Sequence, residues 1–298
     1  MTVGDDSLED AAIRVEQRIR SYGAPGAIVA FSGGVDSSVV LALAVRALGK
    51  GAVRAVTALS PSYPGGELEQ ARASARRLGV SHETVATHEV EKESYAQNDP
   101  LRCFHCKLEL YSSLQKLAPF AGSGEVMLAG ANLDDMDDFR PGLLAARRYG
   151  VRNPLLEERI GKAAVRAIAR RFGLRSADKP ALACLSSRVA YGFRITPEIL
   201  YQIDRAEQLV RARGFPSVRV RHYGVTATIE IPRHDIGRLA ADPELPDLLA
   251  ALKRLGWQQV TVDQNGLRSG SMNAPIRITP ALRRSMERLE AHSTEPPR

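Results

Sequence analysis

The 298-residue sequence is poor in cysteine and in aromatic residues, and it contains no long apolar run. Its three cysteines are too few to build the disulfide framework of a small secreted protein. No apolar stretch approaches the roughly 20 residues of a membrane-spanning helix. The segment from Met1 to Asp10 is acidic and lacks the basic and apolar regions of a signal peptide. We therefore expect a cytoplasmic protein with no membrane partner.

The 41 lysine and arginine residues exceed the 34 aspartate and glutamate residues and give a net charge of +7. This charge suits nucleic acid, but it suits ATP, pyrophosphate or a small acidic substrate equally well. The basic residues are dispersed over predicted helices, as in Arg72, Arg76 and Arg77, where a solvated helix face is the simplest interpretation. The net charge by itself therefore does not identify the partner.

The first 180 residues alternate between apolar runs and amphipathic segments. Strands are expected at 27–31, 52–59, about 83–90 and 126–130, with a short further strand near Val151. Helices are expected at 8–23, 37–48, 67–78, 108–117 and 162–172. Strands separated by helices of this length predict an α/β fold with a doubly wound parallel sheet.

The order of elements changes after Pro180. A long helix at 197–213 precedes strands at 218–222, 226–231 and 259–262, which predicts a second, smaller α+β domain. We expect domains at 1–180 and 181–275, a C-terminal helix and tail at 276–298, and disorder from about Glu290.

A glycine-rich loop follows the first predicted strand, with the residues Ser32, Gly33, Gly34, Val35, Asp36, Ser37 and Ser38. Glycine permits a tight turn whose backbone N–H groups point into one concavity, and the helix that follows presents its positive dipole end. Such a turn at the carboxyl edge of a parallel sheet predicts a phosphate site. The alternative is a helix-capping turn with no ligand.

The loop lacks the lysine of a Walker A motif and resembles the PP-loop of ATP pyrophosphatases, which split ATP between its α- and β-phosphates. The resemblance implies that all seven loop residues contact ATP, with Asp36 near Mg²⁺. A cation is needed there because a carboxylate and a polyphosphate repel each other. The alternative for Asp36 is a first-turn carboxylate that stabilises the helix dipole.

Further segments resemble one PP-loop family in particular, the LarE ATP-dependent sulfur transferases of nickel-pincer cofactor synthesis for lactate racemase. In order along the chain they are NDPLRCFHCK at 98–107, GANLDD at 130–135, RPG at 140–142, DKPALACLSSR at 178–188, YG at 191–192, IT at 195–196, VRVR at 218–221 and SGSMN at 269–273. The resemblance implies adenylation of pyridinium-3,5-biscarboxylic acid mononucleotide, release of pyrophosphate and replacement of AMP by sulfur. Adenylation makes chemical sense because AMP is a far better leaving group than a carboxylate oxygen.

The cysteines are candidates for metal or sulfur chemistry. Cys103 and Cys106 have the Cys-x-x-Cys spacing, and Cys184 is the third cysteine. Family members with three such cysteines imply a [4Fe-4S] cluster with one iron open to sulfide, whereas in other members the residue matching Cys184 donates its own sulfur and becomes dehydroalanine. A structural zinc site, which would need His105 or His82 as fourth ligand, and unligated thiols remain alternatives.

The resemblance also implies roles for polar residues outside the loop and the cysteines. In the nucleotide site these are Gly130, Asn132, Asp134 and a catalytic Lys162, which would act with Asp36 and Cys184. In the substrate site they are Arg140, Ser187, Arg188, Glu207, Arg219, Arg221 and Glu230. The sequence alone leaves helix capping open for Asn132 and Asp134, and a solvent-facing position open for Arg219, Arg221, Glu207 and Glu230. Tyr63, Phe104 and Trp257 are candidates for stacking on a ring, with core packing preferred for Trp257.

Two other functions compete with sulfur transfer to a carboxylate. A tRNA thiolation enzyme combines a PP-loop with three cysteines, but the sequence shows no added zinc knuckle or RNA-binding module, so a nucleic-acid partner is not expected. A non-catalytic nucleotide-binding regulator is the second alternative, since fold does not guarantee activity. The resemblance further implies a sulfide or other sulfur donor and a homo-oligomer, with a hexamer as one form.

Overall fold

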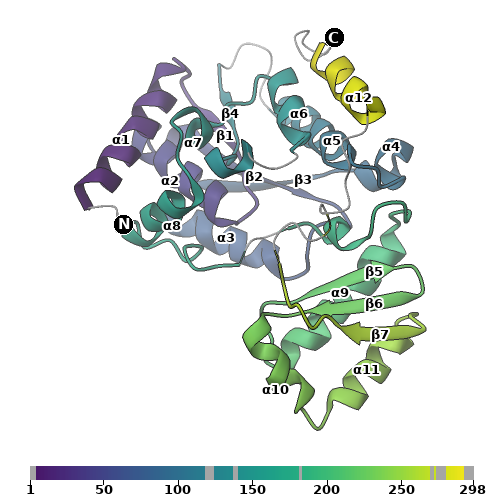
Figure 1. The fold of residues 1–298 in the computed structure, drawn as a ribbon. Coiled ribbons are helices and arrows are strands. Elements are labelled where there is room, and N and C mark those ends of the chain that lie inside the picture. The colour runs from purple at the N-terminus through teal and green to yellow at the C-terminus, as the bar shows by residue number, and fades with distance from the viewer. Residues whose placement is uncertain are drawn as a thin grey trace.

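The computed structural model describes residues 5–117, 124–136, 140–180, 183–268, 272 and 280–291 (Figure 1). Its first part contains α1 (Asp5–Ser21), β1 (Ala27–Ala30), α2 (Val35–Leu48), β2 (Val53–Leu59), α3 (Glu67–Leu78), β3 (Ser81–Ala86), α4 (Glu93–Ala96), α5 (Arg102–Leu117), β4 (Val126–Leu128), α6 (Gly142–Arg148), α7 (Pro154–Glu157) and α8 (Lys162–Arg171). Its second part contains α9 (Pro197–Ala212), β5 (Arg219–Tyr223), β6 (Thr226–Glu230), α10 (Ile236–Ala240), α11 (Leu245–Arg254), β7 (Gln259–Val262) and α12 (Pro280–Ala291). Short 3-10 helices lie at Lys50–Ala52, Glu89–Glu91, Leu133–Met136, Leu185–Arg188 and Arg233–Asp235.

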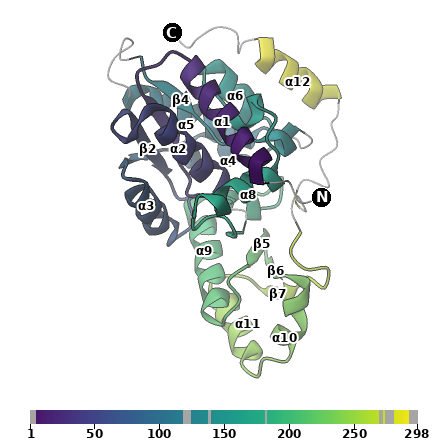
Figure 2. The ribbon, with the colours of Figure 1, turned by 90° about the vertical axis from the view of Figure 1, so that its left-hand side faces the viewer.

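A four-stranded parallel sheet in the order β3-β2-β1-β4 forms the centre of the first part. Side chains alternate between its faces, so that Ala27 and Val29 of β1 join one apolar cluster and Ile28 joins another. Helices α1, α2 and α8 pack with the first cluster, and α5 and α6 pack with the second (Figures 1 and 2). The predicted α/β fold with a doubly wound sheet is therefore confirmed.

Helix α2 is held rigidly because it is buried on most sides. Val39, Val40, Leu41 and Leu43 are all fully buried between the sheet and the helices α1 and α8. Each such side chain contributes about 1.5–3 kcal/mol when it leaves water. The first turn of α2, which follows the glycine-rich loop, is thus fixed in place by the core behind it.

The second part is a small mixed sheet in the order β5-β6-β7, with β5 antiparallel and β7 parallel to β6. Helices α9, α10 and α11 contribute to its apolar cluster, which includes Trp257 and also Val90 and Tyr95 from the first part of the chain. Figure 1 shows this sheet below the parallel one. The predicted α+β character is confirmed, and the domain boundaries stay a prediction.

Several element boundaries differ from the sequence expectation. The strand expected to reach Val90 ends at Ala86, because residues 89–91 form a 3-10 helix, and the strand expected near Val151 is a single bridge between Leu128 and Arg152. Helix α5 begins at Arg102, six positions before the predicted start at Leu108. Helix α12 ends at Ala291, and residues 292–298, where the sequence predicts most of the disordered tail, lie outside the described residues.

Two further findings concern the described part of the chain. Each helix among the described residues is too short or too polar to span a lipid bilayer. The SGSMN match at 269–273 falls outside the described residues except for Met272, as does most of the segment that joins β7 to α12.

Candidate active site

The loop between β1 and α2 makes a close turn against α3. Gly33 has a φ of +76°, and a Cβ there would lie 3.1 Å from the Cβ of Ala71. A larger residue would be strained in this conformation and would press on α3. Gly34 is the N-cap of α2 and has no side chain to cap it. The first N–H groups of α2 are therefore open to an anion.

Hydroxyl groups hold the shape of this turn. Ser37 Oγ accepts a hydrogen bond from Ser32 N at 3.3 Å, donates to Gly34 O at 3.1 Å and lies 3.1 Å from Ser32 Oγ. The hydroxyl of Tyr63 donates to Ser32 O at 3.2 Å. Tyr63, which the sequence offered as a stacking residue, thus supports the loop. The loop is preorganised, which reduces the ordering that a bound phosphate would have to impose.

Asp36 lies at the centre of a polar group on the first turn of α2. Its Oδ1 accepts from Asn132 Nδ2 at 3.0 Å, and its Oδ2 lies 2.5 Å from Lys162 Nζ. Asn132 is buried, whereas Asp36 and Lys162 keep part of their surface exposed. A polyphosphate on the loop would meet both the Lys162 ammonium and the dipole of α2.

Other predicted nucleotide residues have structural partners. Asp134 accepts from the backbone N–H of Lys162 at the start of α8, whose N-cap is Gly161, and donates its own N–H to Asn132 Oδ1 at 3.0 Å, so its carboxylate satisfies one of the first N–H groups of α8. A Cβ on Gly130 would lie 2.8 Å from Ser37 N, so glycine is required there for β4 to approach α2. Arg140 pairs with Asp135 at 2.8 Å.

Asp36 is suited to a magnesium site in which the oxygens of a bound phosphate complete the metal coordination. Mg²⁺ in nucleotide enzymes is usually held by one or two carboxylates together with phosphate oxygens and water. Asp36 supplies one such carboxylate beside the open N–H groups, while Asp134 Oδ2 already accepts a backbone N–H. Within the described residues, no group of three His, Cys, Asp or Glu side chains is arranged to hold a metal ion by itself.

The three cysteines come from two segments that meet. Cys103 and Cys106 lie in the first two turns of α5, because this helix begins before the start that the sequence predicted at Leu108, while Cys184 is the N-cap of the 3-10 helix at Leu185–Arg188. Burial raises the pKa of the Cys106 thiol, and the charges of Glu89, Cys184 and Cys103 add to this effect while Lys107 opposes it. Cys103 has an exposed surface, but desolvation by the surrounding protein still raises the pKa of its thiol, with Arg102 opposing the rise and Cys184 adding to it. The thiols are thus near enough to influence one another, although they do not form a ready metal site.

The Cys184 segment is anchored to the first part of the chain by buried polar side chains. Asn98 Nδ2 donates to the carbonyl oxygens of Ala190 and Phe193 at 2.8 and 2.9 Å. Arg102 donates to Ser186 O at 3.0 Å, and the Tyr95 hydroxyl donates to Ser186 Oγ at 2.6 Å. The segment that carries Cys184 is therefore fixed against α4 and α5.

Two buried arginine–glutamate pairs hold the same segment from the side of the small sheet. Arg188 binds both carboxylate oxygens of Glu207 and donates to Cys184 O at 3.0 Å. Arg221 pairs with Glu230 at 2.8 Å and donates to Ser187 O at 2.9 Å. Each of these four side chains is at most 5% exposed, so the solvent-facing alternative is wrong for Arg221, Glu207 and Glu230.

Arg219 differs from its neighbours. The charges of Arg188 and Arg221 and, above all, burial lower the pKa of Arg219 to about 10. Among the described residues it has no carboxylate partner, whereas Arg221 on the same face of β5 has Glu230. Arg219 is therefore a partly buried cation whose surroundings favour the arrival of an anion.

Sequence reasoning missed one acidic residue beside the thiols. Glu89 is 2% exposed, its Oε1 accepts from Ser60 Oγ at 2.5 Å and from Ser62 Oγ at 2.9 Å, and its Oε2 has no hydrogen-bond partner among the described residues. The strand expected at about 83–90 includes Glu89, and no local sequence pattern indicates that this residue is a buried carboxylate near the thiols. Phe104 and Trp257 belong to the apolar clusters, which assigns them to packing.

Comparisons with known proteins agree with this geometry. The family model of NAD synthase matches residues 8–103, which contain the loop. An uncharacterized protein of Synechocystis is 44% identical over 247 residues, covering 83% of this chain and 91% of the relative. The pyridinium-3,5-bisthiocarboxylic acid mononucleotide synthase of Lactiplantibacillus plantarum is 37% identical over 245 residues, covering 82% of this chain and 88% of the relative.

A third relative, an uncharacterized protein of Methanocaldococcus jannaschii, is 26% identical over 245 residues, covering 81% of this chain and 90% of the relative. These three matches cover 245 to 247 residues each, far more of the chain than the NAD synthase segment at 8–103. The chain therefore belongs to the LarE-like family of PP-loop ATP pyrophosphatases, a membership that implies the use of ATP.

Proposed function

We propose that this protein is an ATP-dependent sulfur transferase that converts a carboxylate of pyridinium-3,5-biscarboxylic acid mononucleotide to a thiocarboxylate, for the nickel-pincer cofactor of lactate racemase. One observation carries the proposal. The Cys184 segment is held by Arg102 and Tyr95 on one side and by Arg188 and Arg221 on the other, so it lies where the part of the chain that carries the ATP loop meets the small sheet that carries Arg219.

In the first step, a substrate carboxylate oxygen attacks the α-phosphate of ATP and pyrophosphate leaves. The open N–H groups of α2 and the Lys162 ammonium stabilise the charge that develops on the departing phosphates. Asp36 would hold Mg²⁺, which supplies further neutralisation of the polyphosphate. Asn132 keeps the Asp36 carboxylate oriented through the 3.0 Å bond to its Oδ1.

Arg219 is the residue we assign to an anionic group of the substrate. Arg188 and Arg221 are already engaged by Glu207 and Glu230, so they act as positioning residues for the Cys184 segment and for Arg219. The substrate carries a phosphate and two carboxylates, which are the groups that a guanidinium binds in bidentate fashion. The roles of Ser187 and Arg140 at the substrate stay predictions.

Sulfur transfer requires a nucleophile that displaces AMP from the acyl adenylate. In the sacrificial route the Cys184 thiolate forms the thioester and expels AMP, after which loss of the Cα proton breaks the Cβ–S bond and leaves dehydroalanine. In the route we favour, Cys103, Cys106 and Cys184 would hold a [4Fe-4S] cluster once their side chains converge, and the cluster would supply the sulfur for transfer. Arg102 and Lys107 would offset the negative charge of three thiolates.

Iron and sulfide analysis of anaerobically reconstituted protein tests the cysteine roles. The cluster hypothesis predicts about four of each per chain and their loss in Cys103→Ala, Cys106→Ala and Cys184→Ala. Because thiols are protonated at neutral pH and burial raises the pKa of Cys106 further, cluster binding should release protons. Full sulfur transfer by Cys103→Ala and Cys106→Ala, with dehydroalanine at Cys184 of the wild type, would support the sacrificial route instead.

Pyrophosphate release tests the proposed substrate. It should depend on the pyridinium dicarboxylate and should not depend on added tRNA, and a tRNA-dependent release would favour the thiolation alternative. A protein that binds ATP but releases no pyrophosphate with any carboxylate would favour the regulatory alternative. The homo-oligomer and the identity of the sulfur donor stay predictions.

A further inference from the structure

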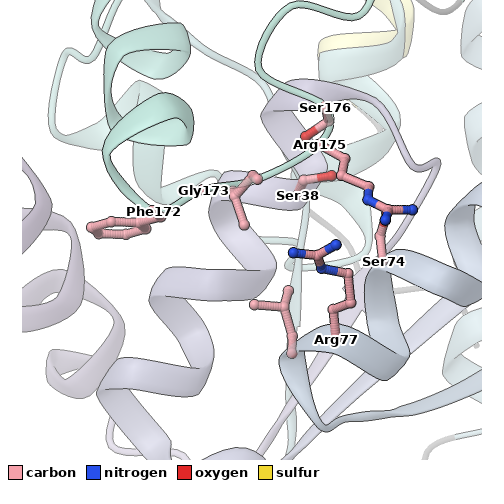
Figure 3. Close-up of a pocket in the computed structure, with 9 residues that line it drawn as sticks. Ser38, Ser74, Arg77, Phe172, Gly173, Arg175 and Ser176 are labelled. Atoms are coloured by element: carbon pink, nitrogen blue, oxygen red, sulfur yellow. The ribbon is translucent and has the colours of Figure 1, made fainter.

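A pocket of about 150 Å³ lies between α2, α3 and the turn that follows α8 (Figure 3). Its lining comprises Ser38, Ser74, Arg77, Leu78 and residues 172–176. It shares Ser38 with the glycine-rich loop, but Asp36, Asn132 and Lys162 do not line it. The pocket is therefore a neighbour of the proposed nucleotide site and has its own set of side chains.

Two buried hydroxyl groups in this pocket lack a partner. Ser38 is 2% exposed and Ser176 is 4% exposed, and in the described part of the chain neither Oγ has a hydrogen-bond partner. Leaving a buried hydroxyl unsatisfied is unfavourable, so such groups usually meet a ligand or an ordered water. In contrast, Ser74 in the same lining donates to Gln70 O at 2.9 Å. The two open hydroxyls belong to segments that are far apart in sequence but meet at one place.

The charge of the pocket identifies the kind of ligand. Arg77 and Arg175 both line it, and neither forms an ion pair with a described residue, whereas the nearby Arg170 pairs with Asp178 at 2.8 Å. The lining contains no aspartate or glutamate. In Figure 3 the guanidinium group of Arg77 extends toward Ser38, whereas that of Arg175 extends toward the side of the pocket where Ser74 lies. Two guanidinium groups and two hydroxyl groups are a donor set for an oxyanion.

We propose that this pocket binds a phosphate-class oxyanion, which would be a second phosphate site behind the first turn of α2. The volume favours a single tetrahedral group, since pockets for nucleotide-sized or drug-sized ligands are about 300–1,000 Å³. Either inorganic phosphate or one end of pyrophosphate has the required chemistry. The site does not depend on the proposed sulfur transfer, because any phosphate in solution could occupy it.

Calorimetric titration of the full-length protein with inorganic phosphate tests the proposal. The wild type should show a binding class that Arg77→Ala/Arg175→Ala weakens at least about 10-fold, through loss of two charge-assisted contacts. Arg76→Ala is the matched control, because Arg76 is exposed on the same helix but does not line the pocket. A parallel titration with pyrophosphate distinguishes the two anions. The occupant of the pocket is the anion that binds the wild type more tightly and whose affinity falls in the double variant.

Anomalous diffraction from crystals soaked in tungstate locates the anion. A peak between Ser38, Ser176, Arg77 and Arg175, in addition to any peak on the glycine-rich loop, is the expected result. A peak on the loop alone, or equal phosphate affinity in the wild type and in the double variant, would overturn the proposal.

Ser176→Ala keeps the test independent of folding. Because the Ser176 hydroxyl is buried without a protein partner, its removal should leave the melting temperature of the phosphate-free protein unchanged or raised. The rise in melting temperature on adding phosphate should then be smaller than in the wild type. An undiminished rise in both Ser176→Ala and the double arginine variant would show that the stabilising phosphate binds elsewhere.

Discussion

Replacement of Arg219 by alanine separates substrate binding from stability. The pKa of Arg219 is lowered to about 10 by burial and by the charges of Arg188 and Arg221. A shift of that size from an ordinary value of 12.5 corresponds to about 3 kcal/mol, which solvent screening of this partly exposed group reduces to about 1 kcal/mol. The guanidinium is therefore held in the free protein at a small loss of stability, which a bound anion would offset.

We expect Arg219→Ala to leave the free energy of unfolding unchanged or to raise it by up to about 1 kcal/mol, as judged from urea unfolding. The same variant should raise the KM for the pyridinium substrate about 10- to 100-fold, since a charge-assisted contact is worth about 1.5–3 kcal/mol. The KM for ATP should change little, because the ATP loop lies on the other sheet. Arg219→Lys should restore part of the loss.

Two results would refute this reasoning. A destabilisation of several kcal/mol would mean that Arg219 has a structural partner after all. Equal losses of affinity for ATP and for the pyridinium substrate would mean that the substitution disturbs the whole site, and that Arg219 does not contact the substrate anion selectively.

The remaining predictions concern the loop, the buried ion pairs and pH. Asp36→Asn should lower pyrophosphate release at least about 100-fold at unchanged melting temperature, because the carboxylate that faces Lys162 and Mg²⁺ is lost; near-normal turnover would remove Asp36 from the reaction. Arg221→Ala should destabilise the protein by about 3–5 kcal/mol in urea, since the buried Glu230 carboxylate would lose the guanidinium that lies 2.8 Å away, in contrast to Arg219→Ala. Burial lowers the pKa of His82, His105 and His222, so the unfolded chain takes up protons at a higher pH than the folded protein does. The free energy of unfolding should therefore fall as the pH is lowered from about pH 7.5 to about pH 5.5. Trp257, which donates to His222 Nδ1, provides a fluorescence signal for unfolding, and a free energy that stays constant over this range would contradict the prediction.

The fold was largely predictable because each strand of the parallel sheet is a short apolar run between helices. The exceptions have local causes. Cys103 and Cys106 join α5 because Arg102 is buried and bonded to Ser186 O, a contact 84 positions away that no local pattern reveals. The strand expected to reach Val90 ends early because Glu89 turns inward toward Ser60 and Ser62.

The candidate site was predictable as a set of residues but not as a set of partners. The Asp36 and Lys162 pairing joins the starts of two helices, and the sequence could place each residue at a helix start without showing that they meet. The sequence also left Glu207 and Glu230 open as surface carboxylates, because burial with an arginine depends on tertiary packing. The structure explains Gly130 by its close packing against α2 and Asp134 by its hydrogen bond to the start of α8. Neither explanation needs a bound nucleotide.

The most direct test of sulfur transfer is mass spectrometry of the product formed with ATP, Mg²⁺, sulfide and pyridinium-3,5-biscarboxylic acid mononucleotide. We expect an exchange of carboxylate oxygen for sulfur, with AMP and pyrophosphate formed in equal amounts to the product, and no product with Cys184→Ala. Release of AMP and pyrophosphate without any exchange of oxygen for sulfur, or undiminished product with Cys184→Ala, would contradict the assignment of this protein as a sulfur transferase that acts through Cys184.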